Sequence, residues 1–236
     1  SFTIPLAARL IVKDHLVVFM RGIPYGILPL PLLLLFGGVW LGVPLGTLLL
    51  QMLPILIVCA LLLLLMKYRE TLCISFFQKL GAFFSMLCSL TFLLIGLQLL
   101  SGRELFLDGA IVAQGAVVIA KMTVILTGAY PLAHFILTKL KRPVRVLSRR
   151  LKINEQSAVG LILCTINCIP MLGLYGEMDD RGRFLNSAFV VSGAFVFGGQ
   201  LAFVAGVEPQ SVLLFLMAKL LGGVLSLLLA ANVLNK

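Results

Sequence analysis

The sequence predicts an all-α, polytopic membrane protein, a fold class indicated by three observations. The chain of 236 residues is 61% hydrophobic and only 12% charged, with a mean hydropathy of +1.12. Its leucine-rich apolar stretches exceed the roughly 18 residues that suggest a membrane-spanning helix. They also lack the alternation over about ten residues that is expected of a barrel strand. A soluble domain of this size would need more polar surface to cover its core, so that class is excluded.

Seven apolar segments are predicted, in order, along the chain. They cover about 22–42, 45–66, 80–100, 109–138, 157–175, 184–206 and 210–232. Little more than Gly42 to Pro44 separates the first two, which predicts a tight hairpin. The fourth is too long for one simple span, and Gly128 and Pro131 predict a kink or break within it. The fifth, 157–175, is the first candidate for a re-entrant segment, which would reverse the side assigned to every later loop.

Positive charge follows the pattern of a membrane protein rather than that of a nucleic-acid-binding protein. The net charge is +10, and 7 of the 19 Lys and Arg residues fall within 139–152. If the start of the chain is cytoplasmic, cytoplasmic regions hold 13 Lys and Arg residues and external regions hold 4. Because positive residues gather in cytoplasmic loops, 139–152 is predicted to be a cytoplasmic loop. No nucleic-acid partner is expected.

Residues 167–183, NCIPMLGLYGEMDDRGR, interrupt the apolar pattern and suggest a site. Pro170 lacks an N–H and clashes with the carbonyl of Ile166, which predicts a helix break inside the membrane. Asn167 can donate or accept hydrogen bonds beside the freed groups. Irregular backbone at this depth must be buried in protein or line a watery cavity, and it often marks a transporter's binding site. The alternative is a proline kink packed on a neighbouring helix, with Asn167 capping the break.

The charged cluster after this break is predicted to be either a solvated inter-helix loop or a gate. Asp179 or Asp180 is expected to cap a helix that begins near Phe184, and Gly182 is expected to supply a turn. The gate or loop residues are Asp179, Arg181 and Gly182.

The sixth segment, 184–206, and Lys121 in the fourth segment complete the predicted site. Ser192 and Gln200 are eight residues apart, roughly on one helix face that could line a cavity, although close helix packing is the alternative. Lys121 lies near the middle of its segment, where a charge is costly and is functional by default. The residues predicted to contact a substrate are Asn167, Pro170, Asn186, Ser192, Phe197, Gln200, Tyr130 and Lys121.

The sequence contains none of the catalytic motifs that would indicate an enzyme. There is no phosphate loop, nucleophile elbow or HExxH motif. Cys164 and Cys168 are one helical turn apart, but no nearby His or acid completes a metal-ligand set. We therefore expect no enzyme activity, no cofactor and no metal site.

Five of these stretches resemble, in order and spacing, motifs of the bacterial ethanolamine-utilisation transporter family. TGAYPL, NCIPMLG, MDDRGR, LNSAFVVSGAFVFG and AKLLGG are similar to that family's GAYP, NNIPMFG, MDTRG, INCAFAVSAAFALG and GKLIGG. The similarity is close over about 123–232 and looser over about 1–105. It implies a multi-pass carrier in the bacterial inner membrane that brings ethanolamine, or a similar small amine, into the cell. Uptake would proceed by facilitated diffusion or secondary transport.

The resemblance also implies how the chain relates to a complete carrier. One integral membrane domain, 1–236, would correspond to the carboxyl-terminal three-fifths of a longer transporter. A missing amino-terminal half, or a homo-oligomer, would then complete the site, and the partners would be the small-molecule substrate and the lipid bilayer. Carbonyls at the broken helix would bind the protonated amine, and the rings of Phe195, Phe197 or Tyr130 would add cation–π contact.

Five positions depart from the family's pattern, and one of them is Lys121, where the family has a small residue. Cys168 replaces an asparagine, Gly199 and Gln200 replace an acid and a histidine, and Val117 replaces another acid. Acids are therefore lost while Lys121 is gained, and two alternatives stay open. One is a non-transporting membrane subunit or scaffold, and the other is a transporter of a different small polar solute with Lys121 as counter-charge.

Overall fold

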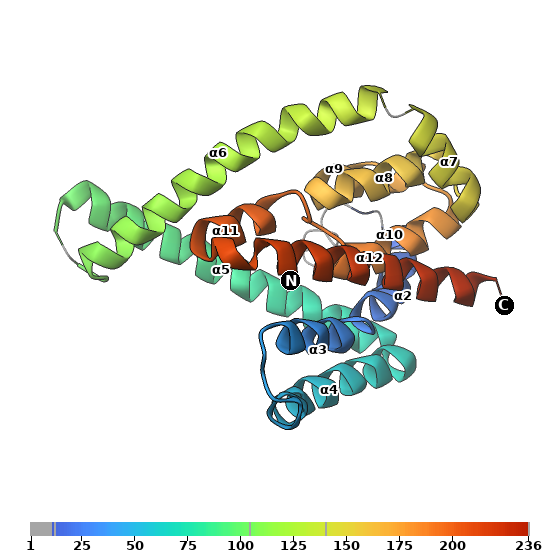
Figure 1. Ribbon diagram of the computed structural model, residues 1–236, viewed down its shortest axis with the longest axis horizontal. Helices are drawn as coiled ribbons and strands as arrows, with labels where there is room; N and C mark the ends of the chain where they lie inside the picture. Colours follow the sequence, from blue (N-terminus) through green and yellow to red (C-terminus); the bar gives the residue numbers. More distant parts are fainter. Residues whose placement is uncertain (1–10, 12, 104, 140, 236) are drawn as a thin grey trace.

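Helices form the framework of the protein in the computed structural model, which describes residues 11, 13–103, 105–139 and 141–235 (Figure 1). These residues contain no β-strand, and the side chains of some helical residues, Tyr130 among them, lie outside the described set. Three described stretches are long and apolar enough to cross a membrane, namely His15–Trp40, Ala82–Ser101 and Pro209–Leu234. Shorter apolar helices cover Leu45–Leu61, Gly109–Val124 and Glu155–Ile166. The predicted all-α membrane fold is confirmed.

The helices follow one another with short connections. In chain order they are α2 (Lys13–Ile27), α3 (Leu30–Trp40), α4 (Leu45–Tyr68), α5 (Glu70–Ser101), α6 (Gly109–Lys139), α7 (Lys141–Leu151), α8 (Glu155–Ile166), α9 (Cys168–Gly173), η1 (Tyr175–Glu177), α10 (Asp180–Ser192), α11 (Gly199–Val207), η2 (Pro209–Ser211) and α12 (Val212–Leu234). The predicted fifth segment is thus divided into α8 and α9. The sixth, 184–206, was predicted as one helix, and this was wrong because it is divided into α10 and α11.

The close packing of α2 on α10 depends on two glycines one turn apart. A Cβ atom on Gly22 would lie 2.5 Å from the Cβ of Ser187, and one on Gly26 would meet the carbonyl oxygen of Ala188. Small residues at this spacing let two helix backbones approach closely where lipid, rather than water, surrounds them. The first crossing, α2 and α3, is therefore joined directly to the helix that carries the later motifs.

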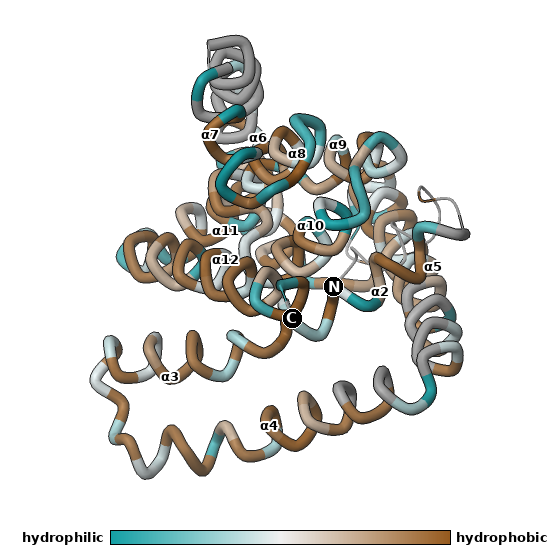
Figure 2. The backbone as a smooth tube through the Cα atoms, turned by 90° about the vertical axis from the view of Figure 1, so that its right-hand side faces the viewer, coloured by the Kyte–Doolittle hydropathy of each residue, from teal (hydrophilic) through white to brown (hydrophobic). Residues whose placement is uncertain are grey.

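Helices α4 and α5 lie at the margin of the structure (Figure 2). Most of the described apolar side chains of α4, α5 and α6 are exposed. The predicted hairpin between α3 and α4 is confirmed, with Gly42 at a φ of +73° and the Val43 N–H donating to the Gly38 carbonyl at 3.0 Å. A kink or a break was predicted at Gly128 and Pro131, and there is no break, because helix α6 continues through both residues. Membrane helices tolerate an internal proline where local adjustment satisfies the freed backbone groups.

Segment 139–152 was predicted as a loop, but most of it forms helix α7. Val144 and Ser148, one turn apart, are buried, and Leu147 and Leu151 are half-buried against the core. Helix formation follows because apolar residues recur three and four positions apart between the arginines. The basic segment is therefore an amphipathic helix packed beside α8.

The core of the described structure lies between α2, α8, α9, η1 and α10. Phe19 of α2 and Tyr175 of η1 are fully buried, and their rings meet edge to face with centroids 5.7 Å apart. Met171 and Leu185 are also fully buried. Both divided segments, α8–α9 and α10–α11, are thus anchored in the best-packed part of the protein.

Candidate functional site

A hairpin that enters and leaves on one side is formed by α8, α9 and η1. The Asn154 side chain, at the start of α8, donates from Nδ2 to the carbonyl oxygen of Glu177 at 2.8 Å. Glu177 is the last residue of η1, so the two ends of the hairpin meet. The segment predicted as re-entrant therefore folds back on itself as a hairpin.

Asn167 forms the tip of the hairpin by ending one helix and beginning the next. Its backbone is extended (φ −152°, ψ 131°), its N–H donates to the Leu163 carbonyl at 2.8 Å, and its Oδ1 accepts from the Ile169 N–H at 2.9 Å. The predicted break exists, but it lies at Asn167 rather than at Pro170. Pro170 occupies the first turn of α9, where no N–H is needed for the helix.

A second break, over 193–198, divides α10 from α11 and was not predicted. Phe195 has a φ of +60°, a left-handed conformation that is uncommon for a non-glycine residue. The Gly193 N–H closes α10 on the Phe189 carbonyl at 2.7 Å, and Gly199 begins α11. The glycines of GAFVFGG were the available signal, but they lie in an apolar run that reads as one helix.

The two breaks are joined to each other by main-chain hydrogen bonds. The Phe195 N–H donates to the Cys164 carbonyl at 3.0 Å, and the Phe197 N–H donates to the Thr165 carbonyl at 2.8 Å. These carbonyls belong to the last turn of α8, which has no helical partners for them. A Cβ atom on Gly198 would collide with the carbonyl oxygen of Ile166, so this approach requires glycine. We call this meeting point of residues 164–167 with residues 193–198, together with the first turns of α9 and α11 that follow them, the junction.

Several predicted site residues lie at the junction with exposed or half-buried side chains. Asn167 is half-buried, Pro170 and Gln200 are exposed, and Phe197 is 46% exposed. Ile169, which was not predicted, is 50% exposed. The junction therefore offers amide groups and an aromatic ring that no core packing covers.

Asn186 and Ser192 are fully buried and join helices together. Asn186 Nδ2 donates to the carbonyls of Ser157 at 3.0 Å and Gly182 at 2.9 Å, while Ser192 Oγ donates to the carbonyl of Gly222 at 3.0 Å. Asn186 Oδ1 has no hydrogen-bond partner among the described residues. These contacts correspond to the helix-packing interpretation rather than to an open cavity wall.

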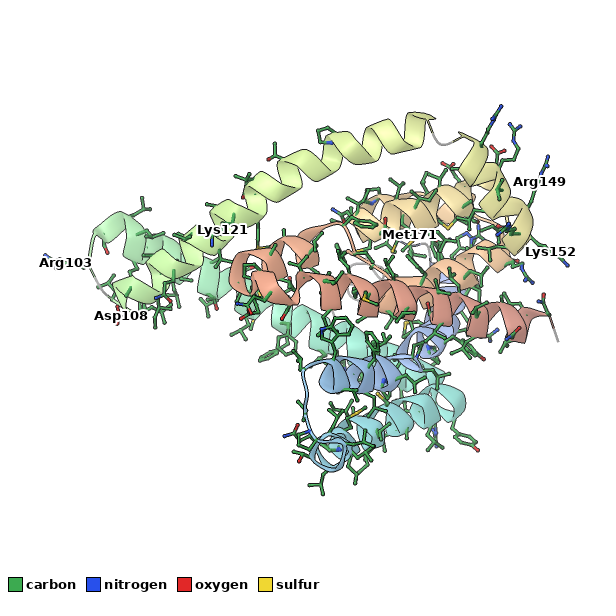
Figure 3. All side chains as sticks on the ribbon, in the orientation of Figure 1. Arg103, Asp108, Lys121, Arg149, Lys152 and Met171 are labelled. Carbon is green, nitrogen blue, oxygen red and sulfur yellow. The ribbon has the colours of Figure 1, made fainter. Side chains whose placement is uncertain are left out.

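Lys121 lies on α6 at the end of α11 that is remote from the junction (Figure 3). Its Nζ donates to the carbonyl oxygen of Gly206 at 3.3 Å. Gly206 follows Gly199 by seven residues, or about 10 Å along a helix. A cation near a helix carboxyl end is favourable, so Lys121 ties α6 to α11. The predicted role of Tyr130 concerns a side chain outside the described set.

The predicted gate residues form the base of the hairpin. Asp179 precedes α10 but makes no side-chain cap there. Its Oδ1 instead accepts from the Asn154 N–H at 3.0 Å and the Ser157 hydroxyl at 2.7 Å. The expected local cap was wrong because a longer-range partner takes the carboxylate. Gly182 is helical rather than in a turn, and a Cβ atom there would collide with Ser157.

Two arginines complete this base. Arg181 Nε donates to the Leu151 carbonyl at 2.8 Å, and its Nη2 donates to Asn235 Oδ1 at 3.0 Å. Arg183, which was not predicted, donates to the carbonyls of Tyr175 and Gly176 and to Asp180. The charged cluster therefore fastens the hairpin to α7, α10 and the end of α12. Among the described residues, no group of three or more His, Cys, Asp or Glu side chains could hold a metal ion.

Comparison with known proteins identifies the same family that the sequence motifs resemble. The family model described as ethanolamine utilisation protein, EutH, matches residues 1–233. The chain belongs to this family. It is 32% identical to the uncharacterized protein YxeR of Bacillus subtilis over 98% of this chain, and 62% of that protein is covered.

Two further relatives carry a functional name. The probable ethanolamine permease EutH of Listeria monocytogenes is 30% identical over all of this chain, with 63% of that protein covered. That of Salmonella typhimurium is 29% identical over 94% of this chain, with 60% of that protein covered. The chain thus spans about three-fifths of the length of these EutH relatives. No solved structure matches.

Proposed function

We propose that this chain forms part of a carrier that moves ethanolamine, or a similar small amine, into the cell, with the junction as its binding site. The observation that carries the proposal is the meeting of two interrupted helices at one point. Secondary transporters bind substrates where discontinuous helices expose backbone groups. Two relatives named probable ethanolamine permease supply the substrate class.

The depth of the junction supports a transport site. Helices α8 and α10 start together, since Asp179 bonds to Asn154, and both end at the junction. Their 12 and 13 residues correspond to about 18 and 20 Å of helix. The hydrocarbon core of a bilayer is about 30 Å thick, so helices of this length end near its middle.

The charge distribution supports a multi-pass orientation in the bacterial inner membrane. A hairpin that returns to its own side transfers Arg181, Arg183 and Lys236 to the cytoplasmic total. The number of Lys and Arg residues then rises from 13 to 16 in cytoplasmic regions and falls from 4 to 1 in external regions. The one external residue is Arg103. This stronger asymmetry is what the positive-inside rule favours.

The chemistry of the junction suits a small protonated amine with a hydroxyl group. The carboxyl ends of α8 and α10 meet there, and their partial negative charge favours an ammonium group. Asn167 and Gln200 supply amide oxygens, and Phe197 offers cation–π contact worth about 0.5–2 kcal/mol. Inward movement of a cation gains about 2.3 kcal/mol per 100 mV, so facilitated diffusion alone can concentrate it.

The test is uptake of labelled ethanolamine by the full-length protein in cells that lack their own carrier. Gln200→Leu should weaken uptake by the equivalent of roughly 1–3 kcal/mol, since a polar partner is lost. Gln156→Leu is the matched control, because both glutamines are exposed and occupy the second position of a helix, α8 or α11. Equal uptake by the two variants at matched expression would contradict the site.

The same cells decide between the alternatives. Uptake of a carboxylate analogue in place of ethanolamine, abolished by Lys121→Ala, would favour an anion carrier. Absence of uptake of any small solute by well-expressed full-length protein would favour a non-transporting subunit.

A further inference from the structure

Helix α7 presents a cationic face that the mechanism at the junction does not use. Its opposite side is fixed to the protein by buried Val144 and Ser148. The exposed positive residues, which we call the basic face, are Arg142, Arg145, Arg149, Arg150 and Lys152. Arg142, Arg145 and Arg149 are three, four and seven positions apart and therefore share one side of the helix. Arg150 follows Arg149 in the last turn, and Lys152 comes directly after the end of α7.

The basic face is poorly neutralised by the chain itself. Its one ion pair among the described residues joins Arg145 Nε to Glu155 Oε1 at 3.8 Å, with the two side chains 63% and 64% exposed. Two acids at the hairpin base are engaged elsewhere, since Asp179 accepts from Asn154 and Ser157 while Asp180 accepts from Arg183. Glu177 is the one exposed acid among the described residues that remains at this base, against five basic residues. Exposed pairs of this kind contribute little, so the surface retains most of its charge.

The position of α7 places this charge where the apolar helices end. Arg181 joins the carbonyl of Leu151, at the end of α7, to Asn235 beyond the end of α12. Figure 3 shows Arg149 and Lys152 projecting away from the helices at this end, whereas Met171 lies among them. Val146, on the outer side of α7, is 51% exposed. An amphipathic helix with these features lies at the level of the lipid headgroups.

We propose that the basic face of α7 binds the phosphate groups of anionic phospholipids. Arginine is suited to this role because its planar guanidinium donates two parallel hydrogen bonds to a phosphate. Clusters of four or more basic residues on a helix beside membrane spans attract anionic lipid in this way. The binding is independent of which solute is carried, so it does not rest on the proposed function.

Lipid bound here would act on the hairpin base, because α7 is hydrogen-bonded to it. The Ile153 N–H donates to the Ser148 carbonyl at 3.0 Å, one residue before Asn154 begins the hairpin. Arg181 fixes the other side through Leu151. Anionic lipid therefore stabilises the α7–hairpin connection as well as the surface of α7.

The experiment titrates fluorescent phosphatidylglycerol against the purified full-length protein in neutral detergent. Arg149→Gln and Arg150→Gln should each weaken binding about fivefold. Arg149→Lys should retain only part of the binding, because it keeps the charge but loses the two parallel hydrogen bonds. Arg103→Gln is the matched control, because Arg103 is exposed in the loop after α5. It should bind like the unaltered protein. Thermal melting in neutral detergent checks that every variant is folded.

Three outcomes would overturn the proposal. Equal affinity of the folded Arg149→Gln, Arg150→Gln and Arg103→Gln variants would show that α7 is not the site. Equal binding of fluorescent phosphatidylcholine would show that charge is irrelevant. Full competition by an equal concentration of inorganic phosphate would identify a soluble anion, rather than lipid, as the ligand.

Discussion

Asn154 and Glu177, separated by 23 positions in the chain, are joined by a 2.8 Å hydrogen bond from Asn154 Nδ2 to the Glu177 carbonyl oxygen. Between them the chain travels along α8, reverses at Asn167 and returns through α9 and η1. An ordinary membrane crossing would leave these two residues at opposite ends of a helix. If the hairpin lies within the membrane as we propose, this contact reverses the side on which every later loop lies.

Cysteine accessibility can test this reversal. We predict that Glu177→Cys and Lys152→Cys resist a membrane-impermeant maleimide in intact cells and react in inverted vesicles. Both positions are exposed and lie at the base of the hairpin. Arg103→Cys, at the opposite end, should react in intact cells.

All three variants belong in a background without native cysteines. Ser148 is a poor reporter because it is only 7% exposed. Labelling of Glu177→Cys in intact cells, with Lys152→Cys protected, would indicate a simple crossing.

The carboxylate of Asp179 should contribute to stability through the base of the hairpin. Its Oδ1 accepts two hydrogen bonds, from the Asn154 N–H and the Ser157 hydroxyl. Asp179→Ala should lower the free energy of unfolding by about 1.5–3 kcal/mol, because bonds to a charged group are lost. Asp179→Asn should cost less, since it keeps an acceptor. Thermal unfolding in detergent measures the effect. Glu155→Gln, at an exposed position, is the control, and its free energy of unfolding should stay within about 0.5 kcal/mol of that of the unaltered protein. A stable Asp179→Ala variant would mean that other contacts hold the base.

Two adjacent glycines provide a matched test of the junction. A Cβ atom on Gly198 would collide with the Ile166 carbonyl oxygen, whereas one on Gly199 would have no neighbour within 4 Å. The φ of Gly198 is −123°, so the requirement there is steric. We expect Gly198→Ala to lower uptake and melting temperature, and Gly199→Ala to leave both nearly unchanged. If the two variants behave alike, the breaks are not packed as described.

The contact between α6 and α11 can be replaced by a covalent bond. A Cβ atom on Gly206 would lie 3.8 Å from the Cβ of Lys121, which is close to the mean separation in disulfides. Lys121→Cys/Gly206→Cys should therefore form a disulfide on oxidation, without native cysteines present. Uptake of ethanolamine should persist in the oxidised protein, because this contact is about 10 Å from the junction along α11. Loss of uptake on oxidation, restored by a reductant, would show that α6 and α11 must separate during transport.

The sequence predicted the features that depend on local composition. The apolar helices, the Gly42 turn and the interruption at NCIP follow from hydropathy and from the chemistry of glycine, proline and asparagine. It did not predict the break at 193–198, because those residues are apolar and their hydrogen-bond partners, Cys164 and Thr165, are some thirty positions away. The misassigned cap at Asp179 has the same cause. The local rule predicted hydrogen bonds to the first N–H groups of α10, whereas in the folded protein Asp179 accepts from Asn154 and Ser157 at the start of α8.

The hydrogen bonds that join the two breaks run between main-chain atoms at Cys164, Thr165, Phe195 and Phe197. Backbone amides are the same for almost every residue type, so this joint does not depend on which side chains surround it. The steric demand falls on two glycines, because a Cβ atom on Gly198 would meet the Ile166 carbonyl oxygen and one on Gly193 would meet the Phe189 ring. Exposed side chains beside the joint, such as Phe197 and Gln200, can therefore be exchanged without breaking its hydrogen bonds, and one scaffold can be retuned to recognise a new solute by altering a few residues.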